Sequence, residues 1–196
     1  LKNNVLVPVF CGSTANNAGI TNLLDFIAQI APSPEGSTDT IVMEDGTEKE
    51  LAVGDGPTAA LCFKTSIDQF SGKLSFIKVV NGTVTGDSDL YNPELGKKEK
   101  PGKVYRAVGK KLIETSALVP GDIGIIAKSN VATTNSTLLA GPDQKFTFKP
   151  LSLPNPVYSL AISAADKKSE DKMNDALHKI TEEDLTFQVG FNEETK

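Results

Sequence analysis

Apolar residues near the start of the chain recur with the period of a helix. The spacing i, i+3, i+4, i+7 and i+11 is met by five side chains: Ile20, Leu23, Leu24, Ile27 and Ala31. This spacing predicts an amphipathic helix, which Pro32 and Pro34 would end. The run VLVPVF at residues 5–10 predicts a short buried strand, and the polar loop CGSTANNAG follows it. We therefore expect residues 1–34 to be a strand–helix piece of a larger α/β unit.

Residues 35–56 form an acidic segment that contains two short apolar runs. In the stretch TIVMEDGTEKELAV, Asp45-Gly46 separates the two runs. Asp-Gly is a favoured two-residue turn between antiparallel strands. The segment is therefore predicted to be a connector that holds a β-hairpin.

From residue 57 to residue 154 the pattern is that of many short strands. Runs separated by Gly, Pro, Asn and Asp lie at AALCFKTSI, GKLSFIKVVNGTV, 87–92, 103–108, 123–128 and 145–153. Short strands at such intervals predict a closed barrel or a sandwich. Gly72, inside the first long hairpin, predicts a bulge or a tight turn at that point.

The last part of the chain returns to mixed periods. PVYSLAI at 156–162 and LTFQVGF at 185–191 predict two strands, and Asp166 is suited to cap the start of a helix between them. The helical stripe consists of Met173, Ala176, Leu177 and Ile180. We expect a β-α-β unit at 155–196 whose sheet is incomplete, so that both ends of the chain are pieces of larger domains.

Charge changes this picture, because it is unevenly distributed. The 196 residues carry a net charge of −5, yet residues 64–111 hold ten basic and five acidic residues. We interpret Lys64, Lys73 and Lys78 as a basic stripe on the polar positions of the first long hairpin. A basic segment in an acidic protein favours a polyanionic partner. The alternative is that these lysines only protect exposed strand edges from aggregation.

Candidate catalytic chemistry is sparse. The sequence has no GxxxxGK[ST] phosphate loop and no GxSxG, and His178, its one histidine, falls on a Lys/Glu-rich helix. We interpret the acidic run at 182–184 as a solvated helix end rather than a cation site, and predict no catalytic and no metal site. Cys11 and Cys62 are too far apart for a zinc framework. With no run of about 20 apolar residues and no signal peptide, we expect a cytoplasmic protein.

Several stretches, in order, resemble translation elongation factor G or a paralogue of it. VPVFCGSTANNAGITNLLDFIAQIAPSP resembles the end of that family's GTPase domain, and GPTAALCFKTSIDQFSGKLSFIKVVNGTV with LVPGDIGII resembles its second-domain β-barrel. PVYSLAI and EDKMNDALHKITEEDLTFQV resemble the start of its third, ferredoxin-like domain. The resemblance implies a mainly β chain: an incomplete GTPase-domain end at 1–34, a connector at 35–56, a barrel at 57–154 and an incomplete third domain at 155–196.

The resemblance also implies a nucleotide site that lies mostly outside this chain. Gly12, Ser13 and Thr14 match the family's fifth GTPase motif, whose backbone contacts the guanine base, although the family usually has Ala in place of Thr14. The parent protein would bind GTP and Mg²⁺ and hydrolyse GTP on the ribosome. We expect this fragment itself to hold no cofactor and to be no enzyme.

In this family the barrel rests on small-subunit ribosomal RNA. The resemblance therefore implies that the basic segment contacts RNA phosphates. The resemblance suggests nine RNA-contact candidates: Lys73, Lys78, Lys97, Lys98, Lys100, Lys103, Arg106, Lys110 and Lys111. Phe70 would either stack on an exposed base or cap the barrel core. We expect as partners the ribosome and the remaining domains of the parent, and no membrane.

The predicted function is a ribosome-docking and domain-coupling segment that acts in translocation during protein synthesis. A segment of a ribosomal protection GTPase is one alternative, and a barrel that binds proteins instead of RNA is another. Val108-Gly109-Lys110-Lys111 stands where translocating factors commonly have Met-His-Ala-Asn. This departure favours a divergent paralogue.

Overall fold

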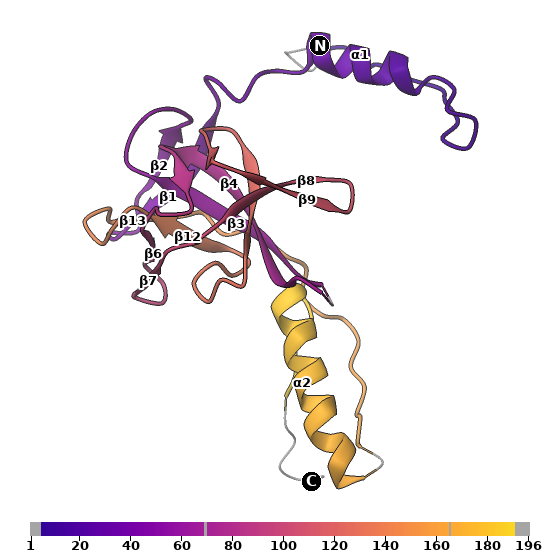
Figure 1. The fold of residues 1–196 in the computed structure, drawn as a ribbon, viewed down its shortest axis with the longest axis vertical. Coiled ribbons are helices and arrows are strands. Elements are labelled where there is room, and N and C mark those ends of the chain that lie inside the picture. The colour runs from indigo at the N-terminus through magenta and orange to yellow at the C-terminus, as the bar shows by residue number, and fades with distance from the viewer. Residues whose placement is uncertain (1–4, 69, 165, 191–196) are drawn as a thin grey trace. The chain divides into compact units, whose positions relative to one another are not determined.

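The computed structural model describes residues 5–68, 70–164 and 166–190, which form two units (Figure 1). The first unit is Leu1–Ser37 and the second is Thr38–Lys196. The elements are α1 (Ile20–Ile30), β1 (Thr38–Met43), β2 (Glu48–Ala52), β3 (Ala59–Asp68), β4 (Gly72–Asn81), β5 (Val84–Thr85), β6 (Leu90–Asn92), β7 (Lys97–Glu99), β8 (Val104–Val108), β9 (Lys111–Thr115), β10 (Ala117–Leu118), β11 (Ile123–Ala127), β12 (Ser136–Leu139), β13 (Phe146–Phe148) and α2 (Lys167–Glu183). The expected mainly β architecture is confirmed.

In the first unit the predicted helix is confirmed and the predicted strand is wrong. The helix α1 ends where Pro32 follows, and its last turn is closed by the Ala31 N–H, which donates to Ile27 O at 2.9 Å. Residues 5–10 form no strand and are exposed. An isolated strand cannot pair its backbone N–H and C=O groups, and the described residues of this unit offer it no neighbouring strand.

The hairpin predicted around Asp45-Gly46 is confirmed as β1 and β2, but its turn is not the predicted two-residue one. The Met43 N–H donates to Thr47 O at 2.9 Å, which leaves three residues in the turn. Gly46 adopts a positive φ of 81°, and the Asp45 carboxylate accepts the Thr47 N–H at 2.9 Å. The strand β1 also pairs with β13, giving a three-stranded sheet in the order β13-β1-β2. The segment that we predicted as a connector is thus paired with a strand from the far end of the predicted barrel.

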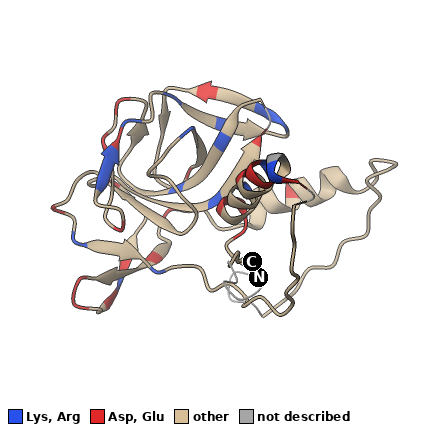
Figure 2. Ribbon diagram, turned by 90° about the horizontal axis from the view of Figure 1, so that it is seen from below, with Lys and Arg blue, Asp and Glu red and all other residues tan. Residues whose placement is uncertain are grey.

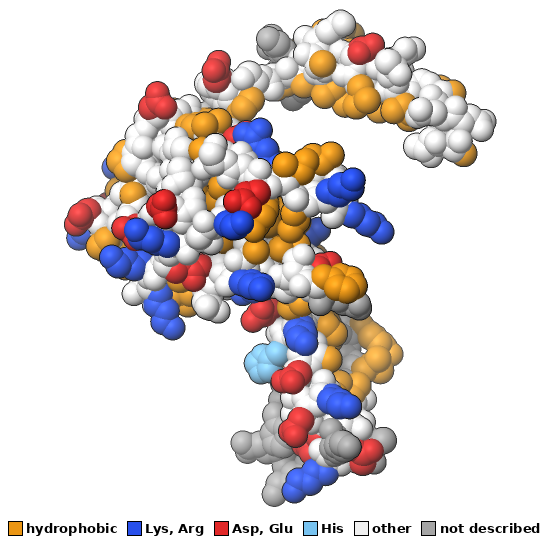
Figure 3. Space-filling view, viewed as in Figure 1, with side chains coloured by type: hydrophobic (Ala, Val, Ile, Leu, Met, Phe, Trp, Pro, Cys, Tyr) orange, Lys and Arg blue, Asp and Glu red, His pale blue; other side chains and the backbone are white. Residues whose placement is uncertain are grey.

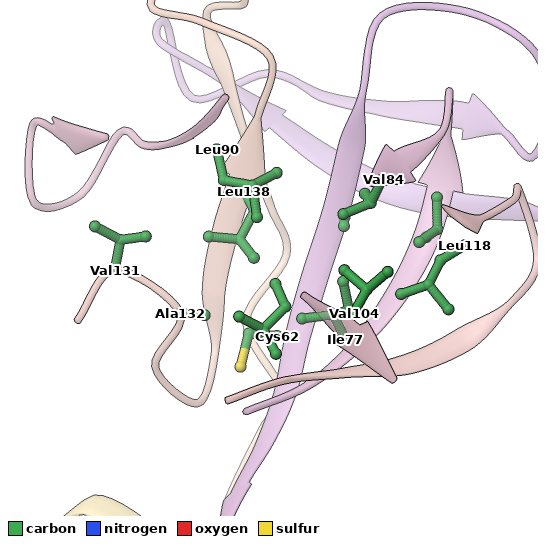
Figure 4. Close-up of a cluster of buried hydrophobic side chains, with 12 residues drawn as sticks. Cys62, Ile77, Val84, Leu90, Val104, Leu118, Val131, Ala132 and Leu138 are labelled. Carbon is green, nitrogen blue, oxygen red and sulfur yellow. The ribbon is translucent and has the colours of Figure 1, made fainter. Parts of the chain in front are cut away.

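The eight-stranded sheet has the order β7-β6-β12-β3-β4-β11-β8-β9, and β5 and β10 form a separate pair. These strands curve around one cluster of buried side chains to make a barrel-like unit (Figure 4). Its members come from eight strands and a loop and include Cys62, Ile77, Val84, Leu90, Val104, Leu118, Val131, Ala132 and Leu138. Burial raises the pKa of the Cys62 thiol to about 11, so this thiol packs as a neutral side chain.

A second buried cluster explains why the run AALC in β3 is apolar without alternation. Ala60 and Cys62 face the first cluster, whereas Ala59 and Leu61 face a second one that includes Ile41 from β1 and Phe148 from β13. Because successive side chains of a strand point to opposite faces, both faces of β3 are covered. The three-stranded sheet is therefore part of the barrel-like unit.

Glycines with positive φ shape the two ends of β4. Gly72 has φ 76° at the turn that joins β3 to β4, which confirms the predicted turn. At the other end Gly82 has φ 65°, and a Cβ there would lie 2.6 Å from Gly56 O. Both the conformation and the close backbone approach require glycine at residue 82.

The strands β7, β9, β10 and β12 were not predicted from the sequence. The most important is β12, whose four residues are all buried and which lies between β3 and β6 in the sheet. Its sequence, STLL, is short and follows the polar run TTN. Its burial comes from β3, which lies more than 60 residues earlier in the chain, so no local periodicity marks it.

In the last part of the chain the helix is confirmed and the two flanking strands are not. The Asp166 side chain accepts the Ser169 N–H at the start of α2, as expected of an N-cap. Residues 156–162 and 185–190 form no strand, since the described residues provide no adjacent strand for them, and residue 191 lies outside the described residues. In the described residues, no helix is both long and apolar enough to cross a membrane.

Candidate nucleic-acid interface

The nine basic candidates are distributed over four strands and the turns beside them. Figure 2 shows Lys and Arg positions interspersed with Asp and Glu over the barrel-like unit. The strand β7, with Lys97 and Lys98, stands at one end of the eight-stranded order, and β8 and β9, with Arg106 and Lys111, stand at the other. The structure therefore divides the candidates into separate groups.

The predicted basic stripe on the β3–β4 hairpin is wrong. Lys73 and Lys78 are five residues apart on β4, and β4 pairs with β11 in regular register from residue 74 to residue 78. Since side chains alternate between faces, an odd spacing puts these two lysines on opposite faces. Lys64 lies over the Phe76 ring, 5.7 Å from its centroid. The three lysines do not form one surface.

Lys78 is held in an ion pair between two sheets. Its Nζ lies 3.0 Å from Oδ1 and 2.7 Å from Oδ2 of Asp39 on β1. Both side chains are partly buried, with exposed fractions of 33% and 23%. This contact ties the three-stranded sheet to the face of β4.

We expect the variant Lys78→Ala to lower the free energy of unfolding by about 1 kcal/mol, because it leaves the Asp39 carboxylate partly buried without its partner. Urea unfolding followed by far-ultraviolet circular dichroism measures this change. Lys98→Ala is the matched control, since this exposed lysine has no ion pair among the described residues, and it should change stability by less than about 0.5 kcal/mol. Equal effects of the two variants would contradict a structural role for the Lys78–Asp39 pair.

Three further candidates also face acidic partners. Lys73 lies 3.4 Å from Glu182 of α2, and Lys103 lies 2.7 Å from Glu114 of β9. The hydrogen bond and ion pair with Glu114 raise the pKa of Lys103 above its usual value. Arg106 donates to the Asp122 carboxylate, which also accepts the Val119 N–H. In these three residues part of the positive charge is already balanced.

The other five candidates are exposed and have no ion pair within the described part of the chain: Lys97, Lys98, Lys100, Lys110 and Lys111. Three of them lie on or just after β7. The β6–β7 hairpin that carries them is fixed by Asn92, whose Nδ2 donates to Val131 O at 2.7 Å, and by Glu99, whose carboxylate accepts the Ser129 hydroxyl and the Asn130 N–H. The lysines thus project from a firmly held hairpin.

Lys110 and Lys111 lie at the tip of the β8–β9 hairpin, where Gly109 turns the chain with φ 60°. Two apolar side chains beside them are exposed, Val108 by 61% and Ile113 by 52%. In the space-filling view, basic side chains gather beside an apolar patch at the place where Figure 1 labels this hairpin (Figure 3). The tip is therefore both basic and apolar.

Phe70 does not cap the core, because its side chain is 94% exposed. The turn that carries it is organised by Asp68, whose Oδ1 accepts the Ser71 N–H at 2.7 Å and the Phe70 N–H at 3.0 Å. Both hydrogen bonds lower the pKa of the Asp68 carboxyl group, and the bond from Ser71 has the larger effect. The turn is therefore most stable at a pH above the ordinary pKa of an aspartate. It becomes less stable as the pH falls through the lowered pKa of Asp68.

The loop with Gly12, Ser13 and Thr14 is closed by backbone hydrogen bonds. Ser13 and Ala18 exchange two N–H···O bonds of 3.0 Å, and a Cβ on Gly12 would lie 2.9 Å from Ala18 O. Thr14 is exposed. The described residues contain no group of three or more His, Cys, Asp or Glu that would hold a metal ion.

Sequence reasoning missed the acidic residues that decide which cations are free. Asp39, Glu114, Asp122 and Glu182 each form an ion pair with one candidate, and Glu99 positions the β6–β7 hairpin. Only the Glu114 pairing has a local signal, because Lys103 and Glu114 flank a hairpin. The other acidic residues reach their basic partners only through the tertiary fold, so no nearby sequence pattern indicates these ion pairs.

Comparison with known proteins finds family models and solved structures that are similar to this chain. Residues 57–141 match the family described as elongation factor G domain 2, and residues 153–196 match elongation factor G domain III. A crystal structure of a protein from Thermus thermophilus is similar over 92% of this chain, with a TM-score of 0.69 and 25% identity. The chain spans 25% of the length of that protein.

Proposed function

Because this chain belongs to the elongation factor G family, we propose that it docks a translational GTPase on the ribosome through phosphates of small-subunit ribosomal RNA. The observation that carries the proposal is the group of five exposed lysines without acidic partners among the described residues, on the β6–β7 and β8–β9 hairpins. Lysines of this kind bind phosphates as point charges and position a protein on RNA without reading its sequence.

Within this proposal, GTP and Mg²⁺ are bound by the parent protein and its GTP hydrolysis drives the rearrangement. Gly12, Ser13 and Thr14 would supply a backbone contact to the guanine base. The barrel-like unit would stay on the small subunit while the third-domain part, with α2, couples to the moving domains during translocation. Phe70 would add base stacking at the tip of the β3–β4 hairpin.

A second candidate function, a protein-binding barrel, is favoured by one observation. Val108 and Ile113 expose apolar surface at the tip of β8–β9, and exposed apolar patches commonly mark protein interfaces. This candidate differs from the first in its dependence on salt, since apolar contacts are not weakened by counterions.

Co-sedimentation of the chain with purified small ribosomal subunits over a salt series tests the first proposal. Contacts to RNA phosphates release about 0.7 to 0.9 counterions each. For five lysines we therefore expect the logarithm of the binding constant to fall with the logarithm of salt concentration with a slope of about −4. Binding that does not change with salt would reject the phosphate contacts, and a lack of binding even at low salt would reject docking by this segment.

A further inference from the structure

The C-terminal end of α2 makes polar contacts with the β3–β4 hairpin. The Glu183 carboxylate accepts the Ser66 hydroxyl at 3.1 Å and also accepts the Ile67 N–H. The neighbouring Glu182 lies 3.4 Å from Lys73 Nζ. These contacts join residues that are more than 100 positions apart in the sequence.

The partner of Glu183 is a free strand edge. The strand β12 pairs with β3 from Ala59 to Cys62 and goes no further, so one edge of β3 beyond residue 63 has no neighbouring strand among the described residues. Free edges present unpaired N–H groups that invite pairing with other chains. A carboxylate that accepts the Ile67 N–H satisfies one of these groups and carries a charge that strengthens the hydrogen bond.

The placement of the two glutamates is unfavourable for the helix itself. The last turn of α2 contains Glu182 and Glu183 and no basic residue. Negative charge at this end opposes the helix dipole. The contacts with Lys73 and β3 offset this effect, so these acids fit a docking role better than a purely helical one.

Little else holds α2 against the barrel-like unit. None of its described side chains is buried, and Ile180 of its apolar stripe is 41% exposed. The chain between β13 and α2 forms no helix or strand in its described residues. This segment is anchored near its start by Asn135, whose side chain exchanges two hydrogen bonds with the backbone of Leu151. The helix is thus tethered, and its contact with the barrel is polar.

We propose that Lys73 and the free edge of β3 form a docking surface for the carboxylate-bearing end of α2. Glu183 covers the strand edge, Glu182 pairs with Lys73, and together they hold the helix on the barrel-like unit. Because the contact is polar and both of its glutamates are exposed, it is weakened by salt and released by loss of charge. The inference concerns contacts within the chain and does not depend on ribosome binding.

Hydrogen exchange of the Ile67 amide, measured by NMR on the whole chain, tests this docking. We expect Glu183→Ala to raise the Ile67 exchange rate about tenfold, the equivalent of about 1.4 kcal/mol, while the amide of Ile77 in the core keeps its rate. Asp175→Ala is the control, since this exposed aspartate of α2 has no hydrogen bond or ion pair among the described residues, and it should leave Ile67 unchanged. Glu183→Ala removes an acid from the helix end, so it does not weaken the helix.

A charge swap tests the second contact. Lys73→Glu should speed Ile67 exchange about threefold, since an ion pair with one exposed partner contributes modestly, and the double variant Lys73→Glu with Glu182→Lys should restore the original rate. An Ile67 amide that exchanges equally fast in the wild type and in Glu183→Ala would overturn the docking. A swap that fails to restore protection would overturn the assignment of Lys73 and Glu182 as a pair.

Discussion

Leu138→Ala is expected to lower the free energy of unfolding by about 3 to 4 kcal/mol. Leu138 is fully buried on β12, in the middle of the first hydrophobic cluster (Figure 4). Its truncation removes apolar contact and leaves a cavity that paired strands on both sides prevent from collapsing. Urea unfolding followed by far-ultraviolet circular dichroism gives the change.

Leu95→Ala is the matched control for this prediction. Leu95 lies in the turn of the β6–β7 hairpin with its side chain 48% exposed, and its truncation should change stability by less than about 0.5 kcal/mol. A loss at Leu138 no greater than the loss at Leu95 would mean that β12 is not a central strand. The comparison therefore tests the strand that the sequence did not predict.

Changing Lys97, Lys98, Lys110 and Lys111 together to glutamate is expected to lower affinity for the small ribosomal subunit about a hundredfold. Each exposed charge contributes somewhat less than 1 kcal/mol, and four reversals add up to roughly 3 kcal/mol. All four side chains are exposed and have no ion pair within the described residues. The fold should therefore be unaffected, which circular dichroism checks, and co-sedimentation at low salt measures the affinity.

A control with the same change in net charge separates local contact from overall repulsion. The four exposed lysines Lys49, Lys145, Lys172 and Lys179 lie outside the two hairpins, and their reversal should lower affinity less than about tenfold. An equal loss in both variants would indicate only net-charge repulsion from RNA. Unchanged affinity in the first variant would instead favour contacts through Val108 and Ile113.

Double variants then show which hairpin makes the contact. The pairs Lys97/Lys98 and Lys110/Lys111 stand at opposite ends of the strand order. If only one hairpin contacts the ribosome, reversal of the two lysines on that hairpin should account for nearly the whole loss of affinity. If both hairpins contact RNA, each pair should lower affinity about tenfold, since distant sites contribute additively.

By itself the sequence determined the elements whose cause is local. The helical spacing at 20–31, the Asp45-Gly46 turn, the Asp166 cap and the long β3–β4 hairpin with its turn at Gly72 all follow from neighbouring residues. The ordered resemblance to elongation factor G also needed no coordinates, and the family matches agree with it. Each of these signals lies within a few tens of residues, where periodicity and turn chemistry act.

Only the tertiary structure decided which charges are free and which strands form. Lys78 meets Asp39, and Glu183 meets the edge of β3, through pairings that no local pattern encodes. STLL at residues 136–139 becomes a central strand because β3 and β6 flank it, whereas the more apolar run at 5–10 forms none. A strand needs a partner for its backbone groups and an ion needs a counterion. Both are supplied by distant parts of the chain, so the fold decides them.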